Sequence, residues 1–100
     1  MNSKDIIDAF TYVANEKGID KVSLTAIIED IFLTLISKKF GEENIDKFSV
    51  IVNMDRGEIE IFQEKLVVDK ILDADFEIVL AEALKIDNTM TVGEICIDIL

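Results

Sequence analysis

Three acidic residues at alternate positions, Asp73, Asp75 and Glu77, are the best candidates in this chain for chemistry at a metal ion. Carboxylates with this spacing begin the loop with which many proteins bind calcium. That loop also needs glycine at its sixth position and glutamate at its twelfth, where this sequence has Ile78 and Leu84. We therefore interpret the three acids as a solvated acidic linker and predict no metal ligands here.

The other residues that could support catalysis lack the partners that their chemistry requires. Glu58 and Glu60 could form a carboxylate pair for acid–base work, but their spacing also suits the solvent face of a hairpin, which we favour. The chain has no histidine, so its serines lack an imidazole base and zinc lacks its commonest ligand. The single cysteine, Cys96, lies between isoleucines, as is typical of a core or sheet position. We predict no catalytic activity and no cofactor.

Length and composition are those of one small domain covering residues 1–100. Half of the residues are hydrophobic and 31% are charged, the balance of a globular domain. Apolar runs are too short to cross a bilayer and the N-terminus lacks a signal-peptide core, so we expect a cytoplasmic protein with no membrane partner. The net charge of −11 repels phosphates, so the chain alone should bind nucleic acid poorly and should prefer a protein partner.

Two helices are predicted in the first forty residues. The first begins after Asn2 or Ser3, either of which can cap it, and ends at Gly18. The second is capped by Asp20 or Ser23, and the short connector predicts a helical hairpin whose helices lie antiparallel or steeply crossed. An apolar stripe on the second helix should pack on the first helix and on a sheet: Leu24, Ile27, Ile28, Ile31, Phe32, Leu35, Ile36 and Phe40.

Beyond residue 47 the apolar residues change from helical spacing to the alternation that is typical of strands. Asp55-Arg56-Gly57 suits a tight turn, because glycine tolerates the positive φ that such a turn needs. A polar break at residues 63–65 leaves open whether the next strand is new or a bent continuation of the same one. The predicted elements are strands at 48–54, 58–61 and 66–68, a strand passing into a short helix at 77–85, and a last strand with Ile95, Ile97 and Ile99.

These elements predict the fold class α+β. An N-terminal helical hairpin would pack on a small, mostly antiparallel sheet of three to four strands, with one short additional helix. The sequence stops at Leu100 within an apolar alternation, which suggests a fragment of a longer multidomain chain.

Five short motifs are spread over nearly the whole chain, namely Lys38-Lys39-Phe40, Asp55-Arg56-Gly57, Leu66–Asp69, Leu80–Ala83 and Val92–Glu94. Their order and spacing resemble the N-terminal domain of the bacterial transcription elongation and termination factor NusA. The resemblance implies a domain that docks on RNA polymerase, chiefly at the flap tip helix of the β subunit. Docked there, it would hold downstream RNA-binding domains beside the emerging transcript and so influence pausing, termination and antitermination.

The resemblance also implies roles for individual residues. Lys38 and Lys39 would face RNA, with Arg56 a weaker member of the group, although two lysines also suit the C-terminal end of a helix. RNA contact by this chain alone should be weak. Phe62 and Leu66, with an edge of the second helix, are candidates for the polymerase-docking surface, and core packing is the alternative for each.

A small-molecule or regulatory binding domain of α+β fold is the alternative function. It predicts an enclosed pocket with converging polar groups, whereas docking predicts a shallow, exposed apolar surface and no small-molecule substrate. A magnesium-dependent enzyme would instead gather Asp73, Asp75 and Glu77 with Glu58 or Glu60 around one cleft.

Overall fold

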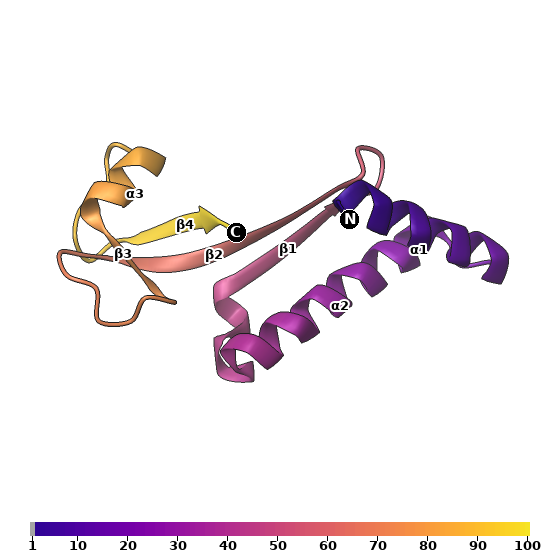
Figure 1. Cartoon of the computed structure of the whole chain (residues 1–100), viewed down its shortest axis with the longest axis horizontal. Helices are drawn as coiled ribbons and strands as arrows, with labels where there is room; N and C mark the ends of the chain where they lie inside the picture. The colour runs from indigo at the N-terminus through magenta and orange to yellow at the C-terminus, as the bar shows by residue number, and fades with distance from the viewer. Residues whose placement is uncertain (1) are drawn as a thin grey trace. The chain divides into compact units, whose positions relative to one another are not determined.

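The computed structural model describes residues 2–100, whose contacts group into two compact units, Met1–Ile61 and Phe62–Leu100. The expectation of one domain over the whole length stays a prediction. None of the helices in the described part of the chain is long and apolar enough to cross a membrane. In chain order (Figure 1) the elements are α1 (Ser3–Lys17), α2 (Lys21–Phe40), the 3-10 helix η1 (Glu42–Lys47), β1 (Phe48–Asn53), β2 (Glu58–Val68), β3 (Glu77–Val79), α3 (Leu80–Ile86) and β4 (Ile95–Ile99).

The strands form one four-stranded sheet of mixed direction, which confirms the α+β class. Its order is β1–β2–β3, and β4 also pairs with β2. The β2–β4 pair is antiparallel and the short β2–β3 pair is parallel. Of the two alternatives left open at residues 63–65, the structure shows a continuation, because β2 runs without interruption through them. Gln63 is compatible with the strand since it is buried and its amide has a hydrogen-bond partner.

Both long helices begin and end at residues that the sequence marks clearly. Asn2 Oδ1 accepts a hydrogen bond from Asp5 N at 2.9 Å, and Asp20 Oδ1 accepts one from Ser23 N at 2.7 Å. Each cap satisfies a backbone N–H of the first helical turn, which has no partner within the helix. Of the residues that the sequence allows as N-caps, Asn2 therefore caps α1 and Asp20 caps α2. Gly18 ends α1 with a φ of 69°, in the left-handed region.

The core of the first unit lies between α1, α2 and the hairpin. Its buried members are Ile7, Ala14, Leu24 and Ile28, with Phe10, Ile19, Phe32, Val52, Met54 and Ile59 packed against them. Part of the predicted stripe on α2 is therefore core, and α2 contacts both α1 and β1. The expected packing of α2 on the first helix and on a sheet is confirmed, but Ile27, Ile31 and Leu35 of the stripe are exposed. These three residues lie on a flank of α2 that neither α1 nor β1 covers.

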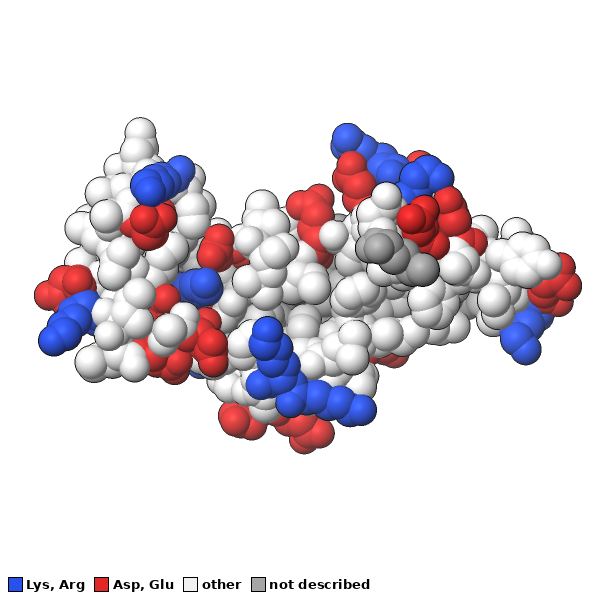
Figure 2. Space-filling view, in the orientation of Figure 1, with Lys and Arg blue, Asp and Glu red and all other residues white. Residues whose placement is uncertain are grey.

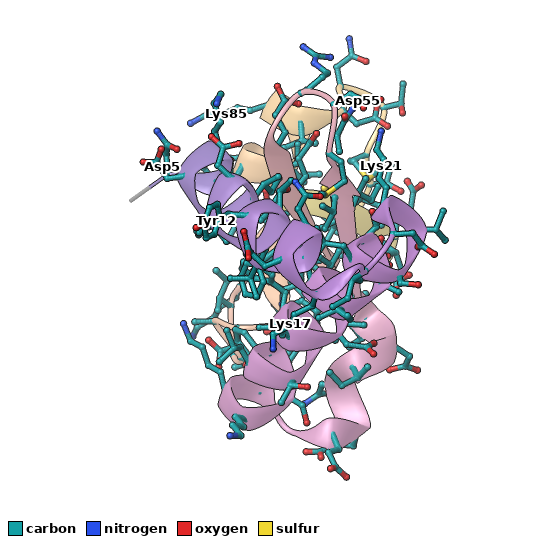
Figure 3. All side chains as sticks on the ribbon, turned by 90° about the vertical axis from the view of Figure 1, so that its right-hand side faces the viewer. Asp5, Tyr12, Lys17, Lys21, Asp55 and Lys85 are labelled. Atoms are coloured by element: carbon teal, nitrogen blue, oxygen red, sulfur yellow. The ribbon has the colours of Figure 1, made fainter. Side chains whose placement is uncertain are left out.

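The turn between β1 and β2 is held against the starts of the two helices. Ser3 Oγ donates a hydrogen bond to the carbonyl oxygen of Gly57 at 3.1 Å, and Lys21 pairs with Asp55 (Figure 3). Gly57 has a φ of 67°, and a Cβ there would lie 2.9 Å from Lys4 Cγ. This turn accepts only glycine without strain, since both the backbone angle and the space are restrictive.

The second unit has a separate core on one face of its sheet. Val67, Ile78, Ala83 and Cys96 are buried there, with Leu80 and Met90 packed against them. Helix α3 supplies Ala83 and so lies on this face (Figure 1). The expectation of a core position for Cys96 is confirmed, and burial raises the pKa of its thiol.

Candidate functional site

Six side chains of β2 and β4 share the face of the sheet opposite to α3. They form three directly opposed pairs across the antiparallel strands, Phe62 with Ile99, Glu64 with Ile97, and Leu66 with Ile95. Because side chains alternate along a strand, these six point away from the buried Val67 and Cys96. We call this set the β2–β4 patch: Phe62, Glu64, Leu66, Ile95, Ile97 and Ile99.

The patch exposes apolar surface that the second unit does not cover. Ile95, Ile97 and Ile99 are 51%, 49% and 62% exposed, Leu66 is 38% exposed and Phe62 is half-buried. The strand predicted from the isoleucine alternation is therefore confirmed, but its isoleucines face solvent and Cys96 faces the core. Phe62 and Leu66, which the sequence proposes for docking, belong to one surface. Sequence reasoning did not propose the three isoleucines beside them for docking. Their alternation along the strand was the signal that could have placed them on one face.

Glu64 is the only charged member of the patch. It is exposed, and within residues 2–100 it has no ion-pair partner. Its neighbour Lys65 lies on the opposite face, where its Nζ is 3.1 Å from Asp98 Oδ2. That pair is largely shielded, with 17% and 28% of the two side chains exposed. Lys65 is therefore committed to Asp98, and Glu64 faces solvent without a cation.

A second exposed apolar surface lies on α2, in the first unit. Ile27, Ile31 and Leu35, four residues apart, line an open hollow of about 320 Å³ together with Asp30 and Thr34. The edge of the second helix that the sequence proposes for docking is thus apolar and accessible. We call Ile27, Ile31 and Leu35 the α2 strip.

A smaller hollow in the first unit has some polar residues in its lining. Its volume is about 210 Å³, and Thr11, Asn15 and Lys21 supply its polar lining. Ligand pockets are usually larger, about 300–1,000 Å³. Lys21 is in addition paired with Asp55. The polar groups around this hollow are too few and too open to solvent to favour the alternative of a small-molecule binding domain.

The basic residues proposed to face RNA fall into two separate places. Lys38 and Lys39 are exposed in the last turn of α2, and within the described residues neither has an ion-pair partner. Lys39 Nζ lies 5.3 Å from the ring centroid of Phe40. Arg56 lies in the hairpin turn beside the start of α2, with its Nε 3.6 Å from Glu58 Oε1. The length of α2 separates Arg56 from the lysines by roughly 25 Å, so the three do not form one phosphate site.

Charged groups are spread unevenly over the surface. In the space-filling view, lysine and arginine side chains lie in small groups, with uncharged and acidic surface between them (Figure 2). The second unit, residues 62–100, has nine acidic residues and three lysines. A partner of this unit gains from carrying positive charge.

The acidic loop before β3 uses its carboxylates to fix its own backbone. Glu77 Oε1 accepts hydrogen bonds from Leu72 N at 2.7 Å and Asp73 N at 2.8 Å, which lower the pKa of Glu77. Asp73 Oδ1 accepts one from Asp75 N at 3.1 Å. Within residues 2–100, no three side chains of metal-binding type gather in one place. Two of the three acids considered for calcium thus have a local structural role.

Comparison with known proteins assigns the chain to a family. The sequence model described as the NusA N-terminal domain matches residues 5–98. Proteins named transcription termination/antitermination protein NusA are similar, with 32% identity in Bacillus subtilis and 34% in Halalkalibacterium halodurans, over 93% and 95% of this chain. The chain covers 24% of each, and so spans about a quarter of the length of these relatives.

A solved structure gives the same assignment. The solution structure of the N-terminal domain of NusA from B. subtilis is 30% identical to this chain, with a TM-score of 0.57. The likeness covers 98% of this chain and 77% of that one. The family suggested by the motifs is thereby confirmed over nearly the full length. This chain belongs to the NusA N-terminal domain family.

Proposed function

We propose that this chain is the RNA polymerase-docking part of a transcription elongation, termination and antitermination factor. Family membership supports the proposal, and the β2–β4 patch is the single observation that carries it. The mechanism is positional, because the domain holds downstream RNA-binding domains near the RNA exit channel without making or breaking a bond. The target on the polymerase is the flap tip helix of the β subunit.

The patch suits such docking on physical grounds. Large exposed apolar surfaces with a polar surround are typical of sites that bind another protein. Phe62 and Leu66 are the docking residues proposed here, and the isoleucines opposite them extend the surface. Covering each half-exposed isoleucine contributes roughly 1 kcal/mol before the costs of association. Several such side chains suffice for binding in the micromolar range.

Lys38 and Lys39 give the same proposal a second, weaker part. Their exposed ammonium groups at the end of α2 contact phosphates of the emerging RNA. The net charge of −11 keeps this contribution small, so the domain depends on the polymerase for its location. Arg56 contacts RNA separately if the transcript passes the hairpin turn.

A titration of fluorescently labelled chain with purified RNA polymerase tests the proposal. We expect saturable binding at tens of micromolar or below, and at least about tenfold weaker binding for Ile97→Asp. Ile51→Asp is the matched control, since Ile51 is 53% exposed on β1 and lies outside the patch. Absence of binding by the natural sequence, or equal losses for both variants, contradicts the proposal.

A further inference from the structure

We propose that the β2–β4 patch selects a partner helix that carries lysine or arginine in the middle of its apolar face. The inference rests on the proposed function, since it uses the same patch, and it specifies the chemistry of the segment that binds there. It depends on the position of Glu64 within the patch and on the spacing of the opposed pairs.

Glu64 lies at the centre of the patch. It is directly opposite Ile97, and the Phe62–Ile99 and Leu66–Ile95 pairs flank it along the strands. Any segment that covers the apolar pairs on both sides must also cover Glu64 and remove its water. A buried carboxylate without a cationic or hydrogen-bonding partner is strongly unfavourable, so the covering segment must supply one.

No lysine of the second unit provides a cationic partner for Glu64. Lys65 is paired with Asp98 on the opposite face, and Lys85 Nζ lies 3.1 Å from Glu82 Oε1. Lys70, the third lysine, forms no ion pair with Glu64 within the described residues. Nine acidic residues against three lysines leave the unit negative, which attracts a basic segment. The cation that neutralises Glu64 therefore comes from the partner.

The spacing of the patch matches a helix. From Phe62 to Leu66 the strand advances four residues, roughly 13 Å. Helical residues at positions i, i+4 and i+8 span roughly 12 Å along one face. A helix lying along the strands thus places an apolar residue at each end of the patch and its middle residue over Glu64. The recognised pattern is apolar, three residues, lysine or arginine, three residues, apolar.

A second copy of this chain is a poor occupant of the patch. Face-to-face pairing of two copies would bury two Glu64 carboxylates in the same interface. Each copy also carries a net charge of −11, which opposes association. The charge of the patch therefore favours a basic helix over self-association.

Two synthetic helical peptides that differ at one residue provide the test. Both have leucine at positions i and i+8 of the presented face, and the residue at i+4 is lysine in one peptide and glutamate in the other. The natural chain is expected to bind the lysine peptide about tenfold tighter or more, as measured by fluorescence anisotropy. Glu64→Lys is expected to reverse this preference, and Glu64→Gln to reduce it.

Asp69→Lys is the matched control, since it makes a comparable charge change in the same unit at an exposed position outside the patch. It is expected to keep the preference for the lysine peptide. Slow reaction of the buried Cys96 with a thiol reagent verifies that each variant is folded. Equal binding of both peptides, or equal effects of Glu64→Lys and Asp69→Lys, overturns the inference.

The polymerase titration separates this inference from the proposed function. Binding of polymerase that is sensitive to Ile97→Asp but indifferent to Glu64→Lys overturns the inference and supports the function. Peptide discrimination without any polymerase binding supports the patch chemistry and contradicts the function. A concentration-dependent dimer in sedimentation that Ile97→Asp dissociates overturns the inference, because the patch would then be covered by a second copy.

Discussion

Gln63 Nε2 donates a hydrogen bond to the backbone carbonyl oxygen of Asp75 at 2.5 Å, from a side chain that is only 2% exposed. The bond joins the middle of β2 to the acidic loop that precedes β3. Glu77 and Asp73 fix the backbone of the same loop through their own carboxylates. The loop before β3 is therefore fixed by the buried amide of Gln63 and by the carboxylates of Asp73 and Glu77.

Replacing Gln63 by leucine tests this role. The variant keeps a similar volume but leaves the Asp75 carbonyl without its partner, so we expect a loss of about 1–3 kcal/mol in the free energy of unfolding. Urea denaturation measures the change, and limited proteolysis in residues 69–76 reports local opening. Glu64→Gln at the exposed neighbouring position is expected to change stability little. Unchanged stability of Gln63→Leu contradicts the role given to the bond.

Gly57 and Gly18 allow backbone strain to be separated from crowding. Both have left-handed φ, 67° and 69°, but a Cβ at Gly57 meets Lys4 Cγ at 2.9 Å and one at Gly18 meets nothing within 4 Å. We expect Gly18→Ala to cost about 1 kcal/mol and Gly57→Ala to cost more, about 2 kcal/mol. Thermal unfolding of the two variants measures the difference. Equal losses would show that Lys4 moves aside freely.

The boundaries of the helices and strands can be predicted from the sequence, because they depend on residues close to each boundary. Asn2 and Asp20 are cap residues with side chains of the right length, and Gly18 is a residue that tolerates left-handed φ. The turn at Gly57 and the alternation on both sides of it are equally local. Such features act within a few residues, so tertiary contacts need not be known to predict them.

The buried face of an element depends on what packs against it, and this is where sequence reasoning fails. Ile27 and Ile28 are adjacent and identical in type, yet Ile28 is fully buried and Ile27 is 41% exposed. In β4 the sequence alternates isoleucine with Cys96 and Asp98, and α3 covers the cysteine side. Apolar character alone does not distinguish the two sides of such a strand. The β2–β4 patch therefore emerges only from the fold, and Phe62 and Leu66 are its members that the sequence proposes for docking.

Stability at acidic pH should depend on Glu77. Hydrogen bonds from the backbone N–H groups of Asp73 and Leu72 lower its pKa below the ordinary value of 4.5. A carboxyl whose pKa is lower in the folded state contributes stability above its unfolded pKa, and this is lost as pH falls through the folded pKa. We therefore expect the destabilisation caused by Glu77→Gln to be present near neutral pH and to shrink below about pH 4.

Urea denaturation of the natural chain and of Glu77→Gln, from about pH 7 to about pH 3, measures this dependence. Glu82→Gln is the control, because Glu82 lies exposed on α3 and contacts no backbone N–H of the loop. A difference between the natural chain and Glu77→Gln that stays constant with pH contradicts the assignment.

The RNA contact proposed for the end of α2 predicts a characteristic dependence of RNA affinity on salt. Each phosphate contact contributes a slope of about 0.7 to the fall of log affinity with log salt for single strands. The double variant Lys38→Gln, Lys39→Gln should weaken binding of labelled single-stranded RNA and reduce that slope by about 1.4. Arg56→Gln should add its own effect independently, because roughly 25 Å of helix separates it from the lysines. Lys17→Gln, at an exposed position at the end of α1, is the control. If it loses half as much affinity as the double variant, the loss follows from net charge alone and contradicts a specific contact.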